Sequence, residues 1–339
     1  MNKSTKVKII DLLPVIFTIL FAIVACVFAV MLYENKWYFA ILLCLAGIIL
    51  NYVAGVLIHE AGHVIAAKKC RLKAMYLNLG IVTIDYVAQK VTPFTFFKKD
   101  AGEARFMAET DITEKQIKRV AAGGLTASLI FMVIGTAAGV IISLLTENAT
   151  AFCLFTAGQA ANFYIFAVNG LSSDKTSDGN IAFGNSDYPA VLAACSNIER
   201  AVLNGGTPTE PDVIKANNQP IALYFHYLFT AISSGKNSAL DLLDENMNLD
   251  ELSDQEYALL LPELIFKLCE RNSLDEKYKS LAEDFFAAEP DGVSVLRAHY
   301  TYREYIGDEK WSSLLKGSYI KLLEKEKPFI VAAENALTK

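Results

Sequence analysis

Paired cysteines are missing from this sequence of 339 residues. Its six cysteines are scattered, and no two of them form a C-x-x-C pair. Three of them lie in apolar runs, where cysteine behaves as a small apolar residue, so neither a disulfide framework nor a structural zinc knuckle is expected. Histidine is scarce too, with four residues in the whole chain. The basic stripe of a nucleic-acid surface is also missing, so no nucleic-acid partner is expected.

Charge is sparse in the first half of the chain, although 53% of all residues are hydrophobic and 20% are charged. Four apolar runs are each long enough to cross about 30 Å of hydrocarbon as a helix. They span residues 12–32, 37–67, 120–145 and 151–171. The first run lacks a cleavage site of small residues followed by polar chain, so it is interpreted as a retained span. The sequence therefore predicts about four transmembrane helices.

Basic residues concentrate between the second and third runs. That loop holds eleven Lys and Arg residues, whereas the loop between the first two runs holds only Lys36 and the loop 146–150 holds none. Positively charged loops stay in the cytoplasm. We therefore expect a multi-pass protein of the cell membrane with both termini in the cytoplasm.

Three ionisable residues stand together inside the second apolar run, in the motif His59-Glu60-Ala61-Gly62-His63. On a helix, His59 and His63 lie one turn apart on the same face, where both imidazoles can bind one metal ion. Glu60 lies beside that face, close to any water on the ion. Ionisable groups at membrane depth are costly and mark functional sites. The motif predicts a zinc site with Glu60 as its acid/base.

A catalytic zinc ion usually has a third protein ligand. The best candidate is Asp178, which is followed by Gly179 and comes just after the fourth apolar run, on the same membrane side as the histidines. Asp174 is a competing ligand, but it lacks a following glycine. His226 and His299 lie in aromatic, helical sequence and are expected to be half-buried helix residues instead.

These motifs resemble the site-2 protease family of intramembrane zinc metalloproteases, over roughly residues 38 to 183. The resemblance implies zinc ligands at His59, His63 and Asp178, a catalytic Glu60, and a substrate-binding role for Asn169. It also implies a core of three helices, corresponding to the second, third and fourth runs. The sequence departs from the family pattern at Ser172, where the family has proline after the asparagine. It departs again at Gly124, where the family often has proline.

The implied function is zinc-dependent cleavage of a membrane-embedded or membrane-associated peptide, as in regulated intramembrane proteolysis or peptide processing. Another membrane zincin, with a glutamate on a later helix as third ligand, is disfavoured because the third and fourth runs hold no suitably spaced Glu. The non-enzymatic alternative is a membrane scaffold with a vestigial zinc site, whose helical repeats recruit partners. The intact Glu60 argues against it.

A stretch rich in β-forming residues, 75–87, directly follows the second run and predicts a hairpin near the membrane face. Family members have a comparable element that can pair with an extended substrate. The alternative is a hairpin that only covers the site. The small residues Gly123, Gly124, Ala127 and Ser128 are interpreted as positions of close helix packing.

From Ser172 onward the chain has 16 Lys and Arg residues against 27 Asp and Glu residues, a formal charge of −11. Apolar residues recur there at helical spacing, and turns are predicted at Gly235, Asn272 and Gly307. The near-regular interval resembles tetratricopeptide-like repeats, which could bind a protein or peptide partner. An irregular helical bundle is the alternative. The expected organisation is an N-terminal helix and loop (1–36), a metalloprotease core (37–183) and a cytoplasmic helical domain (184–339).

Overall fold

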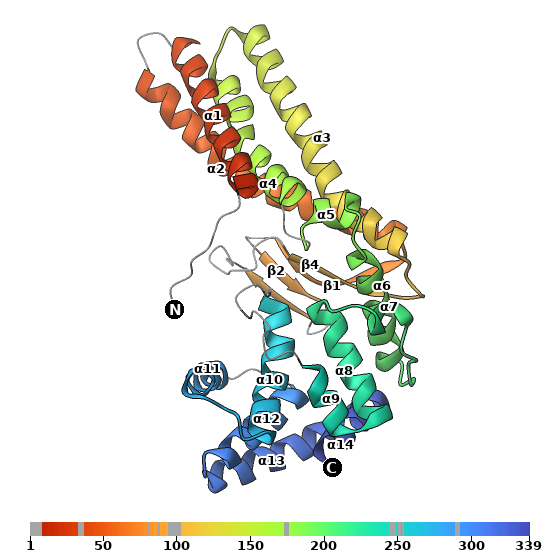
Figure 1. Ribbon diagram of the computed structural model, residues 1–339. Coiled ribbons are helices and arrows are strands. Elements are labelled where there is room, and N and C mark those ends of the chain that lie inside the picture. The colour runs from red at the N-terminus through yellow and green to blue at the C-terminus, as the bar shows by residue number, and fades with distance from the viewer. Residues whose placement is uncertain are drawn as a thin grey trace. The chain divides into compact units, whose positions relative to one another are not determined.

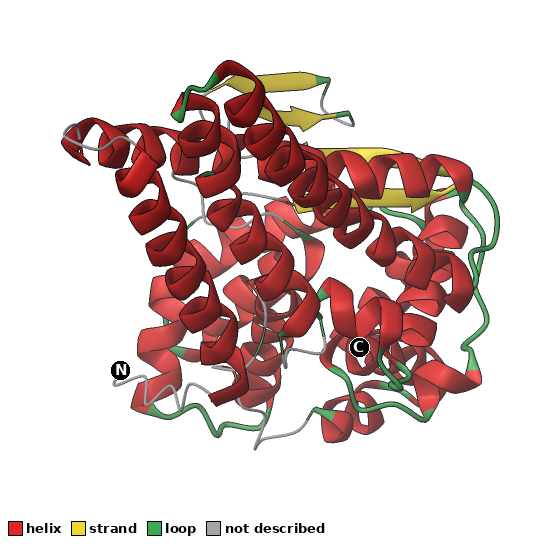
Figure 2. Ribbon diagram, turned by 90° about the horizontal axis from the view of Figure 1, so that it is seen from above, coloured by secondary structure: helices red, strands yellow, loops and turns green. Residues whose placement is uncertain are grey.

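The computed structural model divides the chain into two compact units, Met1–Ala193 and Ala194–Lys339. Helices make up most of the described chain, and the strands are confined to one sheet (Figure 2). The structure describes residues 9–32, 37–79, 82–86, 89–93, 103–172, 176–243, 249, 252, 254–288 and 292–339.

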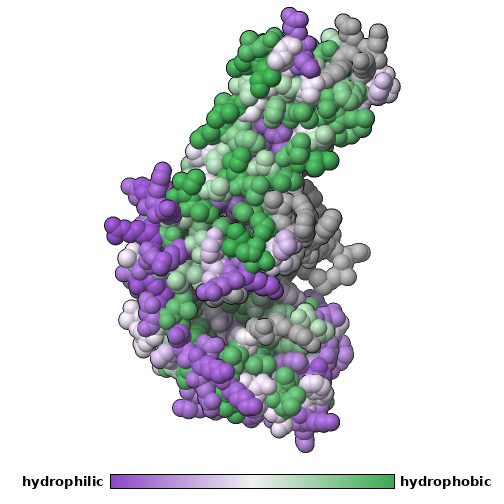
Figure 3. All heavy atoms as spheres, turned by 180° about the vertical axis from the view of Figure 1, so that it is seen from behind, coloured by the Kyte–Doolittle hydropathy of each residue, from purple (hydrophilic) through white to green (hydrophobic). Residues whose placement is uncertain are grey.

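Three helices within the described ranges are long and apolar enough to cross a membrane. They are α1 (Ile9–Leu32), α2 (Trp37–Lys69) and α3 (Glu114–Thr146), and both α1 and α3 pack against α2 (Figure 1). Many of their outward side chains are large and apolar, which gives this bundle the green surface seen in Figure 3. Apolar groups left exposed over whole helices match a lipid environment rather than water.

The fourth predicted span is helical but is not one uninterrupted α-helix, so the fourth transmembrane helix stays a prediction. A π-helical segment (Phe152–Ala157) comes first, and α4 (Gln159–Leu171) follows it after Gly158. The break lies against α2, where the Asn51 side chain donates a hydrogen bond to the carbonyl of Leu154 at 2.9 Å. Composition predicted the apolar run but not the π-helical segment, which periodicity does not mark.

The broken segment returns antiparallel to α3. The Thr156 hydroxyl donates to the carbonyl of Thr136 at 3.2 Å, and the Asn162 carboxamide donates to the carbonyl of Ser128 at 3.3 Å. Residue numbers therefore rise along one helix as they fall along the other. The end of α4 consequently comes back to the level at which α3 begins.

A small antiparallel sheet lies between α2 and α3 in the sequence. Its strands are β1 (Leu72–Asn78), β2 (Val82–Asp85), β3 (Lys90–Pro93) and β4 (Glu103–Ala108), in the spatial order β3-β2-β1-β4. The predicted hairpin is confirmed, because β1 pairs with β2. The two outer strands were not predicted.

After α4 come the short helix α5 (Asp178–Phe183) and α6 (Tyr188–Leu203). The predicted helical C-terminal region is confirmed. Its turns at Gly235, Asn272 and Gly307 all have the positive φ angles that end helices. The assignment to tetratricopeptide-like repeats stays a prediction. The helices are α7 (Asp212–Lys215), α8 (Pro220–Ser234), α9 (Lys236–Leu242), α10 (Asp254–Glu270), α11 (Glu276–Ala287), α12 (Val293–Tyr305), α13 (Glu309–Leu323) and α14 (Pro328–Thr338).

The C-terminal unit has an ionic cluster in its core. Arg297 of α12 is fully buried and donates to Glu263 of α10 at 2.7 Å and to Glu334 of α14 at 2.8 Å. Its guanidinium also lies over the ring of Phe266, 4.1 Å from the ring centre. Three helices therefore meet at one buried cation.

Candidate metal centre

His59, Glu60 and His63 form a buried group near the C-terminal end of α2. Their exposed fractions are 4%, 3% and 8%, and one ligand atom from each lies within 4.8 Å of the others. The two imidazole rings face one another edge to face, one helical turn apart. This group could bind a metal ion, as the motif predicted.

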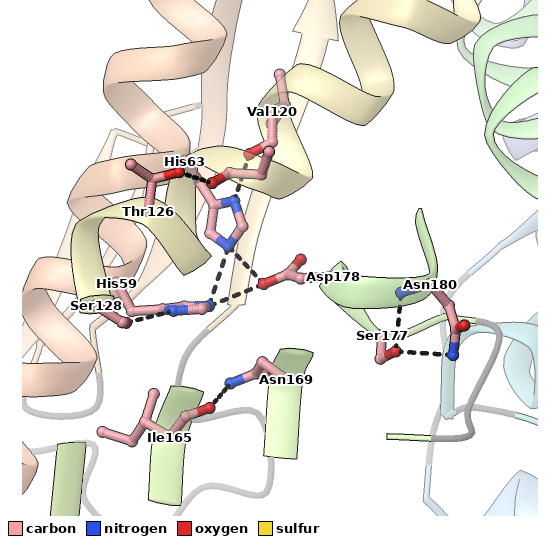
Figure 4. Close-up of polar contacts among 11 residues, drawn as sticks. His59, His63, Val120, Thr126, Ser128, Ile165, Asn169, Ser177, Asp178 and Asn180 are labelled. Carbon is pink, nitrogen blue, oxygen red and sulfur yellow. Dashed lines mark hydrogen bonds and ion pairs between the residues drawn. The ribbon is translucent and has the colours of Figure 1, made fainter. Parts of the chain in front are cut away.

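Asp178 meets both imidazoles, although it lies 119 residues after His59. Its Oδ2 is 2.9 Å from Nε2 of His59 and 3.1 Å from Nε2 of His63, and the two Nε2 atoms are 3.2 Å apart (Figure 4). A tetrahedral zinc ion with bonds of about 2.0–2.1 Å separates its ligand atoms by about 3.3 Å. The three donors therefore already stand close to the spacing of three corners of such a tetrahedron.

The other nitrogen of each ring shows which way the lone pairs point. Nδ1 of His63 lies 2.8 Å from the carbonyl oxygen of Val120, which can only accept, so Nδ1 carries the proton. Nδ1 of His59 lies 3.0 Å from the hydroxyl of Ser128, which can accept in the same way. In neutral rings both Nε2 atoms then carry lone pairs directed toward the Asp178 carboxylate. Lone pairs that converge in this way repel one another unless a cation lies between them.

The chemistry of the donors leads to the same conclusion. The Asp178 carboxylate faces two imidazoles that are neutral in the state just described. Two nitrogen donors and one oxygen donor suit zinc, so the donor set fits that ion.

Two glycines let α2 and α3 approach closely enough to build the site. A Cβ on Gly62 would lie 2.7 Å from the Cβ of Ala127, and a Cβ on Gly123 would lie 2.6 Å from the Gly62 carbonyl oxygen. The backbone of Gly124, the next residue, lies directly against the imidazole rings of His59 and His63. A Cβ there would lie 2.6 Å from Cε1 of His63. At the crossing of α2 and α3, these positions therefore have no room for a side chain, because the facing backbone and the imidazoles fill the space.

A second glycine contact places Asp178. A Cβ on Gly179 would lie 2.9 Å from the Cα of Gly170, so the start of α5 packs directly on the backbone at the end of α4. Ser177 caps α5 by accepting a hydrogen bond from the backbone N–H of Asn180. Burial would raise the pKa of the Asp178 carboxyl, but without a metal ion, when Nε2 of the rings is protonated, hydrogen bonds from His59 and His63 outweigh burial and lower the pKa to about 2. Asp178 is therefore a carboxylate at neutral pH.

Asn169 lies in the last turn of α4, and its side-chain nitrogen donates to the carbonyl of Ile165 at 2.9 Å (Figure 4). Its substrate-binding role stays a prediction. Asp174, the competing ligand, lies outside the described residues. His226 lies on α8, where it contacts Glu210, and His299 lies on α12, stacked on Phe286.

Three contacts of the site were not expected as site residues from the sequence: the Ser128 hydroxyl, the Val120 carbonyl and the Gly124 backbone. The small residues Gly124 and Ser128 had indicated close packing, which is correct, but not packing on the imidazoles. Their spacing offers a signal in retrospect, because Val120, Gly124 and Ser128 recur every four residues on one face of α3. The contact of the Val120 carbonyl could not be predicted in this way, because every residue has a backbone carbonyl.

Comparisons of the chain with protein-family models, with curated proteins and with solved structures gave no match. The functional conclusion therefore rests on the motif and on the geometry around it.

Proposed function

We propose that this chain is an intramembrane zinc metalloendopeptidase, similar to the site-2 proteases, that cleaves membrane-embedded or membrane-associated peptides. The observation that carries the proposal is the convergence of His59 Nε2, His63 Nε2 and Asp178 Oδ2 within 2.9–3.2 Å of one another. The Nδ1 contacts of both rings add support, because they direct the lone pairs inward.

Metal binding and proton transfer would be carried out by different residues. His59, His63 and Asp178 hold the ion and leave a fourth position open for water or substrate. A zinc ion held by these residues would supply Lewis-acid chemistry for the scissile carbonyl and for water. Glu60, adjacent to the ligands, accepts the proton of the attacking water and delivers it to the amine nitrogen as the peptide bond breaks.

The substrate would have to present extended backbone, because helical peptide bonds are protected by their own hydrogen bonds. The small sheet offers two edge strands, β3 and β4, on either side of the central pair. Addition of a substrate strand at such an edge is a common way to bind an extended peptide. Asn169 would help to hold the substrate near the ion. The C-terminal helices would bind a protein or peptide partner.

The membrane assignment is supported by three helices of sufficient length and apolarity. The basic loop between the second and third of them argues for a cytoplasmic site at the cell membrane. The histidines belong to the last three turns of α2, which ends at Lys68 and Lys69.

Metal content and turnover, measured on the same preparations, test the proposal. Purified wild type should carry about one zinc ion per chain. Glu60→Gln should keep the metal and lose activity, because it removes the base but no ligand. His63→Ala and Asp178→Ala should lose both. His226→Ala is the matched control, since it removes a histidine remote from the motif in sequence.

Each outcome separates the alternatives. A wild type without zinc contradicts the enzyme and its metal site together. Zinc that is present, with no peptide accumulating in Glu60→Gln cells relative to wild-type cells, would support the scaffold with a vestigial site. Small membrane peptides that accumulate only in the Glu60→Gln cells would identify the substrate.

A further inference from the structure

Three carboxamide side chains form a continuous hydrogen-bonded row inside the membrane bundle, which we call the amide chain: Asn51, Gln159 and Asn162. The Gln159 nitrogen donates to Asn51 Oδ1 at 2.7 Å, and the Asn162 nitrogen donates to Gln159 Oε1 at 3.1 Å. Their exposed fractions are 6%, 1% and 0%. Burying polar groups in an apolar bundle is costly, so the amide chain is expected to have a structural or functional role.

One end of the amide chain holds the helix break. The Asn51 nitrogen donates to the carbonyls of Gly47 at 2.8 Å and of Leu154 at 2.9 Å, where the π-helical segment crosses α2. Asn51 is the member of the row that contacts the Leu154 carbonyl. Gln159 and Asn162 extend the row away from this contact.

The other end of the amide chain reaches the candidate metal centre. Asn162 donates to the backbone carbonyl of Ser128 at 3.3 Å, and the hydroxyl of the same Ser128 lies 3.0 Å from Nδ1 of His59. Asn162 Oδ1 has no hydrogen-bond partner among the described residues, so the Asn162 carboxamide is oriented through its nitrogen. Gly55 leaves room for that oxygen, because a Cβ there would lie 3.0 Å from it.

We infer that Asn162, held by Gln159 and Asn51, is a positioning residue that acts on the metal ligand His59 through Ser128. Outer partners of metal-binding histidines fix the ring orientation and commonly change metal affinity 10–100-fold when removed. Here Asn162 does not touch the ring. It holds the backbone of the residue that does, so the orientation of His59 depends on α2, α3 and α4 together. The inference depends on the proposed zinc site.

A double-mutant cycle on zinc affinity tests this dependence. The dissociation constant for zinc alone is measured by chelator competition on the purified full-length protein in detergent. Ser128→Ala should weaken binding about 10–100-fold and Asn162→Leu about 10-fold. The double variant should bind no more weakly than Ser128→Ala, because the inference has Asn162 act on His59 through Ser128. The visible spectrum of the cobalt-substituted protein should change in both single variants.

Thr156→Val is the matched control. It removes another hydrogen bond to α3, the one from the Thr156 hydroxyl to the Thr136 carbonyl at 3.2 Å, but it lies outside the amide chain. It should lower the unfolding temperature without changing zinc affinity or the cobalt spectrum. If Asn162→Leu does not fold, Gln159→Leu tests the same row, since Gln159 Oε1 accepts from the Asn162 nitrogen.

The results distinguish this inference from the proposed function. Wild type that binds no zinc contradicts the metal site itself. Wild type that binds zinc, with Asn162→Leu unchanged in affinity, contradicts only the positioning role. Effects of Asn162→Leu and Ser128→Ala that multiply in the double variant would also overturn it, because independent structural damage gives that result.

Discussion

Gly124 carries no functional group, yet it is one of the residues on which the candidate site depends most directly. Any side chain there would occupy the volume of both imidazoles. A Cβ would lie 2.6 Å from Cε1 of His63 and 2.9 Å from Nε2 of His59. Glycine within a helix costs about 0.5–1 kcal/mol relative to alanine. Retaining it at this position favours the site over the stability of α3.

We expect Gly124→Ala to abolish zinc binding while the protein still folds, because the new methyl group displaces the rings but suits a helix. Gly317→Ala is the control, since a Cβ on Gly317 in α13 meets nothing within 4 Å. The control should raise stability by about 0.5–1 kcal/mol and leave zinc binding intact. Zinc titration and thermal unfolding measure the two effects. Normal zinc affinity in Gly124→Ala would contradict the geometry.

His299 predicts a pH dependence in the C-terminal unit. Burial, with a further contribution from the guanidinium of Arg303 and against an opposing effect of Glu283, lowers the pKa of His299 from 6.5 to about 4. The ring stacks on Phe286 with centres 4.1 Å apart, and its Nε2 accepts a hydrogen bond from Arg303. The folded protein therefore keeps His299 neutral at a pH where the unfolded chain already binds a proton.

The stability that neutral His299 contributes is complete above about pH 6.5 and is lost as the pH falls toward about 4. We expect His299→Phe, which keeps the stacking but cannot titrate, to lose less stability than wild type across that interval. Unfolding midpoints of both proteins over the pH range measure the difference. Parallel curves for the two proteins would show that His299 does not titrate as described.

At the scale of elements, local patterns predicted more than long-range contacts. His59 and His63 share a face because the helical period is a property of α2 alone, and β1 pairs with β2 through a short connection. The outer strands β3 and β4 and the break before α4 depend on distant partners. A glycine such as Gly62 shows that close approach is allowed, but not that Gly123 is the residue that approaches.

The resemblance and the position after an apolar run identified Asp178 from the sequence. The contacts that hold the site in place were not predicted. The Gly170–Gly179 contact and the amide chain join residues that are far apart in the sequence or on different helices. Neither charge nor periodicity marks such pairs. The same limit applies in the C-terminal unit, where Arg297 joins three helices through two glutamates.

That buried cluster supports a prediction on stability. Arg297→Met keeps much of the side-chain volume but leaves Glu263 and Glu334 buried without their cation, which should destabilise the protein by about 3–5 kcal/mol. Arg271→Met is the control, because Arg271 and Asp241 pair at 2.6 Å on the surface, where an ion pair contributes about 0–1 kcal/mol. Denaturant unfolding of the C-terminal unit measures both. Equal losses of stability in Arg297→Met and Arg271→Met would show that the buried ion pairs contribute no more than the exposed one.

For the whole molecule, the membrane unit has one end that carries the site and one that does not. Val120, near the start of α3, contacts His63 near the end of α2, and Asp178 returns to the same level after α4. The hydrogen bonds of Thr156 and Asn162 to α3 show that the broken fourth segment runs back along the bundle. The turn around Asn148, between α3 and that segment, therefore lies at the opposite end from the site.

This arrangement gives a testable topology. If α3 crosses the membrane, a reporter inserted at Asn148 should lie outside the cell, whereas reporters at Glu109 and after Lys339 should both lie in the cytoplasm. A fusion partner that is active only outside the cell, and one that fluoresces only inside it, measure the three positions. The Glu109 fusion is the control, because the basic loop fixes that side. A cytoplasmic Asn148 would mean that α3 does not span. An external C-terminus would mean that the broken segment does not return, and Asp178 could then not reach the histidines.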